Sequence, residues 1–280
     1  MVTATRLLLG FSLLTGPLAY EGAAGPPPPS AVTAWDQYVR QTERRIEDEL
    51  NGREFLAVSS LAPAHAARAR SPRAAAGLLY VVPVATTGGP GADEVPGGLR
   101  HHWLAAVFVP GVKVEDVLAF VQDYDHQAGV FEDVLVSRLL ARDGDYFEPL
   151  LRLRRTKVIT AVYDTTHAVH YKAHGGGRAS SRSVATRIVE LERTGGADAY
   201  RPRPDAKDRG FLWRLNSYWR FLAVPGGVIV ECESTSMSRA IPTGLSWLIG
   251  HYVNSIPKES LERTLTGIKN GVLARAGRTK

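Results

Sequence analysis

The sequence predicts an α+β fold, in which an antiparallel sheet packs against a long C-terminal helix and an N-terminal extension precedes both. From about residue 100 to residue 239, runs of β-branched and aromatic residues alternate with glycine-containing turn signals, as in consecutive antiparallel strands. After Arg239 the apolar residues fall at helical spacing, ending in the stripe Leu261, Leu265, Ile268 and Val272. This stripe needs a partner, and the sheet offers the available apolar surface.

Composition limits the classes of function. The chain has 280 residues, of which 44% are apolar and 22% charged, which is ordinary for a soluble globular protein. Its formal net charge of +6 would suit an anionic partner, but the basic residues are scattered among acidic ones, so we expect no nucleic-acid partner. The single Cys232 excludes an intramolecular disulfide and a cysteine-rich metal site, and we expect it to be a small buried apolar residue.

The first 24 residues have the features of a secretory signal peptide. Arg6 precedes an apolar run over residues 7–14, and Gly22-Ala23-Ala24 offers a small-x-small cleavage site. The run is too short to span a bilayer. We therefore expect an exported protein, periplasmic or secreted, rather than a cytosolic protein with an apolar leader. Residues 25–30 read as a stiff, proline-rich linker.

Residues 31–98 are predicted to form an N-terminal α/β extension. Apolar spacing predicts an amphipathic helix over residues 31–50, ended by Asn51-Gly52. Two short strands are expected over residues 54–61 and 77–86. Five glycines and two prolines between residues 88 and 98 indicate a boundary near residue 99. Whether this extension packs on the following domain is left open by the sequence.

The ligand-binding domain is placed at residues 99–274, with a basic tail at 275–280. A short helix is expected at 114–123, and a short helix near residues 245–252 should lead into a long one that Ser255 caps. Residues 193–209 should be a solvated excursion, and Gly175-Gly176-Gly177 a hairpin loop, because no helix follows it to support a phosphate. The expected strands outside the central hairpin cover residues 100–109, 131–142, 146–157, 158–164, 169–173 and 180–192.

The most informative stretch is the central hairpin over residues 211–239, which turns at Pro225-Gly226-Gly227. With Gly226 and Gly227 as loop residues, Phe221 faces Cys232 on the inner face, and Arg220 pairs with Glu233 on the outer face. The inner face is apolar near the turn and carries hydroxyls farther from it, which suits a cavity better than a dry core. Its members are Leu215, Ser217, Trp219, Phe221, Val230, Cys232, Ser234, Ser236 and Ser238.

Two groups of residues invite a catalytic or metal interpretation. Asp123, Asp125 and His126 could pair for acid-base chemistry, but an acidic helix end is a common cap and turn. His167 and His170 point to opposite faces of a strand, so these two and His174 cannot converge on a metal without a bulge or turn. We therefore predict no catalytic residue, no metal and no cofactor.

The order of elements resembles the helix-grip fold of the START-like superfamily, also called SRPBCC. Local stretches at residues 178–187, 215–220 and 230–239 are similar to those of uncharacterised bacterial members, and the resemblance covers residues 101 to 274. It implies a curved antiparallel sheet wrapped around the terminal helix, with a hydrophobic ligand between them. The superfamily has no universal catalytic residues to carry across.

The function expected from the resemblance and the inner face is non-enzymatic binding or transport of a hydrophobic small molecule or lipid. The serines would either orient the ligand or bond locally within the sheet. An alternative is an enzyme of the polyketide cyclase or aromatase kind, with Tyr163, Tyr218 and Tyr252 as conceivable donors, although the register places Tyr218 outside. A third is an interaction module with a filled core. Transient membrane contact is compatible with these expectations, and the oligomeric state is left open. The predicted cavity lining comprises Ser217, Trp219, Phe221, Ser234, Ser236, Ser238, Leu261, Leu265 and Ile268.

Overall fold

The computed structural model describes residues 25–70, 78–86, 89–90, 92–156, 160–196, 198–240 and 246–278. The predicted signal peptide at residues 1–24 lies outside this set. So do Leu245 and the side chains of residues 246–254, which include that of Tyr252.

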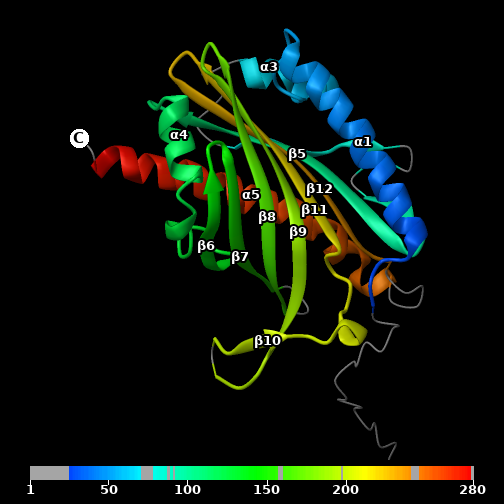
Figure 1. Cartoon of the computed structure of the whole chain (residues 1–280). Coiled ribbons are helices and arrows are strands. Elements are labelled where there is room, and N and C mark those ends of the chain that lie inside the picture. The colour runs from blue at the N-terminus through cyan, green and yellow to red at the C-terminus, as the bar shows by residue number, and fades with distance from the viewer. Residues whose placement is uncertain are drawn as a thin grey trace, which may run out of the picture.

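One curved antiparallel sheet organises the molecule (Figure 1). Its strands follow the order β1-β5-β12-β11-β9-β8-β7-β6, with short β4 added to β5 and short β10 to β9, while β2 and β3 pair separately. The strands are β1 (Leu78–Pro83), β2 (Ala85–Thr86), β3 (Gly89–Pro90), β4 (Ala92–Val95), β5 (Gly98–Pro110), β6 (Val134–Asp143), β7 (Tyr146–Thr156), β8 (Thr160–Gly175), β9 (Arg178–Arg193), β10 (Tyr200–Pro202), β11 (Arg214–Val224) and β12 (Gly227–Arg239).

Helix α5 (Ser246–Arg278) crosses the inner face of the sheet, and short α4 (Val114–Val121) packs beside it (Figure 1). Two glycines let other segments approach α5 closely. A Cβ at Gly271 would lie 2.2 Å from the Phe120 ring, and one at Gly267 would lie 2.7 Å from the Phe131 ring. Leu261, Leu265, Ile268 and Val272 all enter the inner core, as the helical stripe predicts.

The predicted break between two C-terminal helices is wrong. Residues 246–278 form one continuous helix, with Pro257 inside it, so Ser255 does not cap a helix start. A proline removes one backbone hydrogen bond from a helix interior and commonly marks a helix start, which is why the sequence suggests a boundary there. The helix also includes most of the predicted basic tail.

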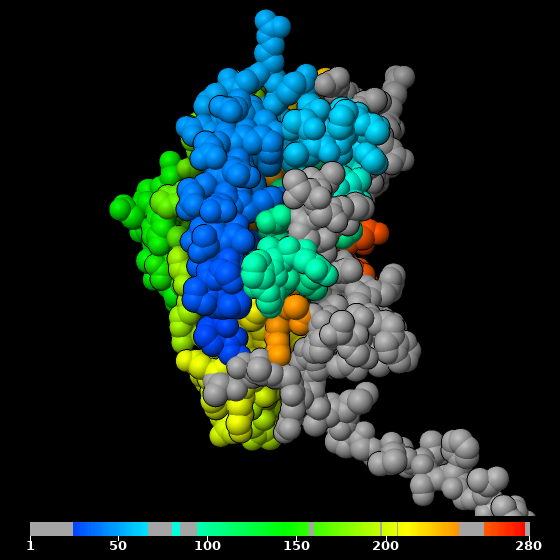
Figure 2. All heavy atoms as spheres, turned by 90° about the vertical axis from the view of Figure 1, so that its right-hand side faces the viewer, coloured from blue at the N-terminus to red at the C-terminus, as the bar shows by residue number. Residues whose placement is uncertain are grey.

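The outer face of the sheet is covered by the N-terminal segment. Helix α1 (Pro29–Asn51) runs along this side of the molecule, seen in blue in Figure 2, followed by α2 (Val58–Leu61) and α3 (Pro63–Arg70). Strands β1 and β4 pair with β5 in the main sheet. The segment before residue 99 therefore packs on the sheet, which the sequence left open. Helix α1 begins at Pro29, so the last residues of the predicted linker belong to it.

The strand predicted over residues 54–61 is wrong, because helix α2 forms there. The Glu231 carboxylate of β12 accepts hydrogen bonds from the backbone N–H groups of Ala57 (2.6 Å) and Val58 (3.2 Å). A carboxylate at a helix start satisfies N–H groups that have no partner within the helix. This partner lies 174 positions away in sequence, so local propensity could not reveal it.

The central hairpin forms as predicted, but its register differs by two residues. Pro225 and Gly226 are the loop residues, so Phe221 lies opposite Val230 and Arg220 opposite Glu231. Gly227 is a ladder residue whose Cβ would lie 2.2 Å from the Val109 carbonyl oxygen, so this glycine serves close approach to β5. Because the shift is even, every residue keeps its predicted face.

The remaining hairpins follow the glycine signals. Gly144 has a φ of +54° in the β6–β7 turn, and Gly176 and Gly177 form the β8–β9 turn with φ of +57° and +71°. Strand β8 is continuous through residues 165–168, where the sequence suggests a gap. The predicted excursion after residue 193 carries β10 and a short 3₁₀ helix (Asp205–Lys207).

The α+β prediction is confirmed: a curved antiparallel sheet grips a long terminal helix, and an N-terminal extension covers its back. This is the helix-grip fold. Within the described residues, no helix is both long and apolar enough to cross a membrane.

Candidate ligand cavity

A cavity of about 410 Å³ lies between the inner face of the sheet and α5. Strands β7, β8, β9, β11 and β12 form its floor and sides. Residues 256–268 of α5 and the loop before β6 close it. Ligand pockets in proteins typically measure about 300 to 1,000 Å³. The space is therefore large enough for a small organic molecule.

The structure brings eight of the nine predicted lining residues to the cavity wall, which are Ser217, Trp219, Phe221, Ser234, Ser236, Ser238, Leu261 and Ile268. Leu265 is the exception. Its side chain is fully buried in the inner core, while the neighbouring Thr264 lines the cavity instead. Cys232 is also in the wall and 1% exposed, as expected for a small buried residue. Burial raises the pKa of its thiol well above the usual range.

Six serines form a polar band across the apolar floor, which we call the serine belt. Ser217 of β11 lies directly opposite Ser234 of β12 and Ser183 of β9, so three hydroxyl-bearing residues stand side by side on neighbouring strands. The full belt consists of Ser181, Ser183, Ser217, Ser234, Ser236 and Ser238.

Four hydroxyls of the belt have no protein partner in the part of the chain that the structure describes, namely those of Ser181, Ser217, Ser234 and Ser236. Local bonding within the sheet, one of the two explanations considered for the serines, therefore does not account for these four. Leaving a buried hydroxyl unpaired costs about 1–3 kcal/mol, so hydroxyls that face a cavity favour a partner inside it.

A buried histidine stands at each end of the serine belt. His101 on β5 contacts the Ser238 hydroxyl through Nε2 at 3.2 Å. His167 on β8 contacts the Ser183 hydroxyl through Nδ1 at 3.2 Å. Burial lowers the pKa of each imidazole to about 4, so both are neutral at neutral pH. Sequence reasoning did not assign His101 to the cavity, although strand alternation places it on the inner face with Ala105 and Val107.

Three arginines in the cavity wall, Arg155, Arg209 and Arg263, pair with carboxylates of the protein. Arg155 and Arg263 both form ion pairs with Asp133, the second at 3.0 Å, and Arg155 also donates to the Ser260 hydroxyl. Arg209 binds the fully buried Glu190. Each of these cations therefore has a carboxylate partner, although Arg155 and Arg263 share Asp133, and Arg209 shares Glu190 with Arg203.

The conceivable proton donors divide between the two faces. Tyr163 lines the cavity, and burial raises the pKa of its hydroxyl well above the usual range, so it stays protonated. Tyr218 lies on the outer face, where its hydroxyl donates to Glu43 at 3.0 Å, in agreement with the predicted register. The third, Tyr252, has no described side chain.

The acid-base and histidine groups considered from the sequence do not come together in the cavity. Asp123 and His126 contact each other at 2.6 Å at the exposed end of α4, and Asp123 also pairs with Arg275. His170 and His174 are not among the cavity-lining residues, and only His167 is. Among the described residues, no group of three potential ligands is placed to hold a metal ion.

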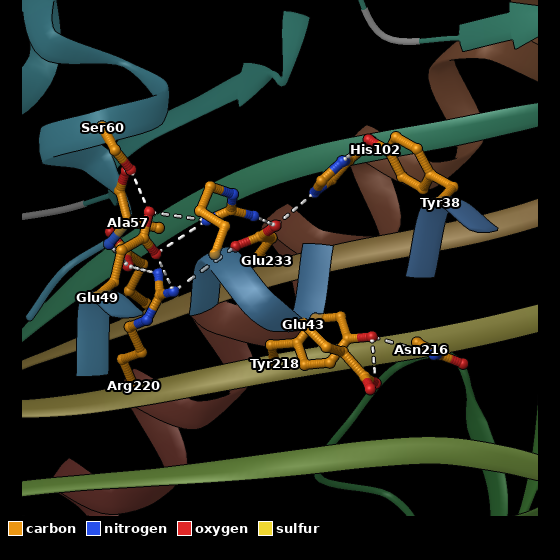
Figure 3. A network of polar contacts seen from close by, with 12 residues as sticks. Tyr38, Glu43, Glu49, Ala57, Ser60, His102, Asn216, Tyr218, Arg220 and Glu233 are labelled. Carbon is orange, nitrogen blue, oxygen red and sulfur yellow. Dashed lines mark hydrogen bonds and ion pairs between the residues drawn. The ribbon is translucent and has the colours of Figure 1, made fainter. Parts of the chain in front are cut away.

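The reverse side of the cavity floor carries a buried charge network, which we call the outer network (Figure 3). Arg220, 1% exposed, binds Glu231 at 3.0 Å and also binds Glu49 of α1. Glu233 accepts a hydrogen bond from His102 at 2.8 Å and pairs with Arg45 of α1. The network comprises Tyr38, Arg45, Glu49, Tyr80, His102, Arg220, Glu231 and Glu233.

The outer network ties α1 to the strands that line the cavity. Because side chains alternate, Arg220 stands between Trp219 and Phe221, which point into the cavity. The predicted ion pair of Arg220 with Glu233 is present at 3.8 Å, but its closer partner on β12 is Glu231. Sequence analysis placed these residues on the outer face but not under a helix.

Several solved structures are similar to this chain at low sequence identity. A STAR-related lipid transfer protein from Xanthomonas axonopodis is 19% identical with a TM-score of 0.45, over 65% of this chain and 96% of that one. Human STARD10 is 12% identical with a TM-score of 0.44, over 68% and 74%. The Zhui aromatase/cyclase from Streptomyces sp. R1128 is 12% identical with a TM-score of 0.41, over 64% and 94%.

The chain is similar in structure to START-like proteins. The similar structures include both lipid-transfer proteins and aromatase/cyclases, so the likeness does not choose between binding and catalysis. No protein-family model matches the sequence, and no curated protein is similar to it at a significant level.

Proposed function

We propose that the chain binds a hydrophobic small molecule or lipid in the cavity between sheet and α5, as a carrier or sensor and not as an enzyme. The observation that carries this proposal is a cavity of about 410 Å³ with apolar walls and unpaired hydroxyls on its floor. Apolar walls supply binding free energy, while a few polar groups set orientation.

The proposal is tested by analysing what the purified chain carries. Native mass spectrometry, followed by solvent extraction and mass analysis, should find a small apolar molecule on the wild-type chain. Ser217→Phe places a ring in the cavity and should abolish this cargo. The matched control Arg187→Phe, at an exposed position of β9, should keep it. Wild-type chain without cargo that also binds nothing from a lipid panel would refute the proposal.

A second candidate function is catalysis in the same cavity, of the polyketide cyclase or aromatase kind. The observation that favours it is Tyr163, a buried phenol in the cavity wall that stays protonated and could donate a hydrogen bond to the oxygen of a reacting carbonyl. A poly-β-ketone thioester should then be converted to a ring product, detected by liquid chromatography. Tyr163→Phe should abolish conversion while the substrate still binds. Unchanged substrate after incubation with the wild-type chain would leave the carrier function as the better account.

A further inference from the structure

We propose that the ligand is a rigid molecule with several hydroxyl or carbonyl oxygens along one edge, and not a lipid with a single terminal head group. This inference rests on the proposed binding function and narrows the class of ligand.

The first step concerns charge. A carboxylate or phosphate in the cavity would need a cation. Arg155, Arg209 and Arg263 in its wall each pair with a protein carboxylate, and Arg239, which also lines the cavity, has an interaction partner as well. Arg263 has a second acidic neighbour, Glu132, at 3.9 Å. Asp133 is shared by Arg155 and Arg263, and Glu190 is shared by Arg203 and Arg209, so each of these carboxylates holds two cations. These arginines are therefore engaged with protein carboxylates, and the hydroxyls of the serine belt are uncharged groups that face the cavity.

The second step concerns the polar groups that remain without a protein partner. Within the described part of the chain they include the hydroxyls of Ser181, Ser217, Ser234 and Ser236 and the Nδ1 atom of His101. His101 is 2% exposed, so this nitrogen cannot rely on bulk water. A hydroxyl both donates and accepts, and a neutral imidazole nitrogen does one or the other. These groups can form hydrogen bonds with hydroxyl or carbonyl oxygens of a ligand.

The third step concerns position. The serine belt crosses the strands, and neighbouring strands lie about 4.8 Å apart, so Ser183, Ser217 and Ser234 spread over roughly 10 Å. Along the strands, apolar side chains lie on both sides of the belt. Phe221 lies on the side of the β11–β12 turn, and Leu153 lies on the opposite side. An acyl chain with one terminal head group would leave most of the belt unpaired. A fused-ring molecule with oxygens along one edge would pair it.

The fourth step concerns the opposite wall. Leu261 and Ile268 of α5 and the ring of Phe131 face the cavity from the side away from the belt. These three residues offer apolar contact only. Thr264 and Ser260 of the same helix also line the cavity, but the Thr264 hydroxyl donates to the Ser260 carbonyl and the Ser260 hydroxyl accepts from Arg155. A flat molecule would therefore be held with its oxygens toward the sheet and its apolar surface toward the helix.

The experiment compares matched probes on matched variants. Dihydroxyanthraquinone is the oxygen-bearing probe, anthracene has the same three rings without oxygen, and parinaric acid is the fatty-acid probe. Binding is titrated by absorbance or fluorescence with the wild-type chain and with the triple variant Ser217→Ala, Ser234→Ala, Ser236→Ala. The control is Ser180→Ala, a buried serine on the outer face of β9 whose hydroxyl bonds to His174. Thermal unfolding verifies that the variants fold.

The wild-type chain should bind dihydroxyanthraquinone more tightly than the other two probes. The triple variant should lose about ten- to hundredfold affinity for it, as expected for two or three lost hydrogen bonds, and keep its affinity for anthracene. Equal wild-type affinity for all three probes, or an unchanged affinity in the triple variant, would overturn the inference while leaving hydrophobic binding intact. Binding of none of the three would count against both the inference and the proposed function.

Discussion

At the scale of single residues, buried charge decides how the two faces of the sheet differ. Arg220 is enclosed between β11, β12 and α1 and has carboxylate partners on two elements. Replacing it with methionine would leave Glu49, Glu231 and Glu233 short of one positive charge in a buried site. Removing one partner of such a pair costs about 3–5 kcal/mol, far more than an exposed ion pair contributes.

We therefore expect Arg220→Met to lower the free energy of unfolding by about 3–5 kcal/mol, measured by urea denaturation. Arg187→Met, at an exposed position on the same face, is the matched control and should change it by less than about 0.5 kcal/mol. Equal effects of the two substitutions would show that the outer network is not a major source of stability.

Two buried imidazoles predict how stability depends on pH. The pKa of His101 and of His167 falls to about 4 on burial, whereas an exposed histidine titrates near 6.5. Between these values the unfolded chain binds the protons and the folded chain does not. Protons therefore favour unfolding, and the free energy of unfolding should fall as pH drops from about 6.5 to about 4.

The measurement is urea denaturation at a series of pH values. Replacing both histidines with glutamine should flatten the pH dependence of the free energy of unfolding in this window.

Glu233 of the outer network titrates at a lower pH than these histidines. Burial alone would raise its pKa, but the His102 hydrogen bond and the charges of His102, Arg45 and Arg220 lower it to about 2. Its stabilising contribution is lost only from about pH 4.5 downward, so loss already at pH 6 in the glutamine variant would contradict this assignment.

At the scale of elements, the fit between α4 and α5 depends on a glycine. A Cβ on Gly271 would lie 2.2 Å from the Phe120 ring, so Gly271→Ala must push the two helices apart or turn the ring. Overpacking of this kind costs about 1–3 kcal/mol, whereas alanine in an open helix position gains up to about 1 kcal/mol over glycine.

Gly277→Ala is the matched control, because nothing lies within 4 Å of its Cβ position on the same helix. We expect Gly271→Ala to lower the unfolding midpoint and Gly277→Ala to leave it unchanged or raise it. If both Gly271→Ala and Gly277→Ala raised the unfolding midpoint, α4 would not pack on α5 as described.

The elements also show what sequence could and could not predict. The alternation of side chains along the strands and the glycines in the turns predicted the hairpins. They also predicted that Ser217, Trp219 and Phe221 lie on the inner face, because side-chain alternation is local information. The register was two residues off, because Gly227 serves the approach of β5 and not the turn. Helix α2 was missed because Glu231, distant in sequence, satisfies its first N–H groups.

At the scale of the whole molecule, the N-terminal segment braces the reverse side of the cavity floor. Helix α1 reaches Arg220 and Glu233 through Glu49 and Arg45, and both sheet residues alternate with cavity-lining ones. The sequence predicted this helix but not its position, because helical spacing defines an apolar stripe and not the surface that receives it. The cavity itself was expected from the serines on the inner face, and its pairing of charges could be found only from contacts between distant elements.

We further propose that the chain is exported, as the apolar run of residues 7–14 and the small residues 22–24 suggest. Expression in a bacterial host with cell fractionation and mass analysis of the intact protein is the test. We expect a product cleaved close to residue 24 outside the cytoplasm. Uncleaved protein in the cytoplasm would contradict export without affecting the cavity.

The most direct test of the central claim is a crystal structure of the chain grown with dihydroxyanthraquinone or with its own extracted cargo. The account predicts electron density for the molecule between Ser217 on the sheet and Ile268 on α5, with its oxygens toward the serine belt. A structure in which Trp219, Leu261 and Ile268 close together and leave no room there would contradict it.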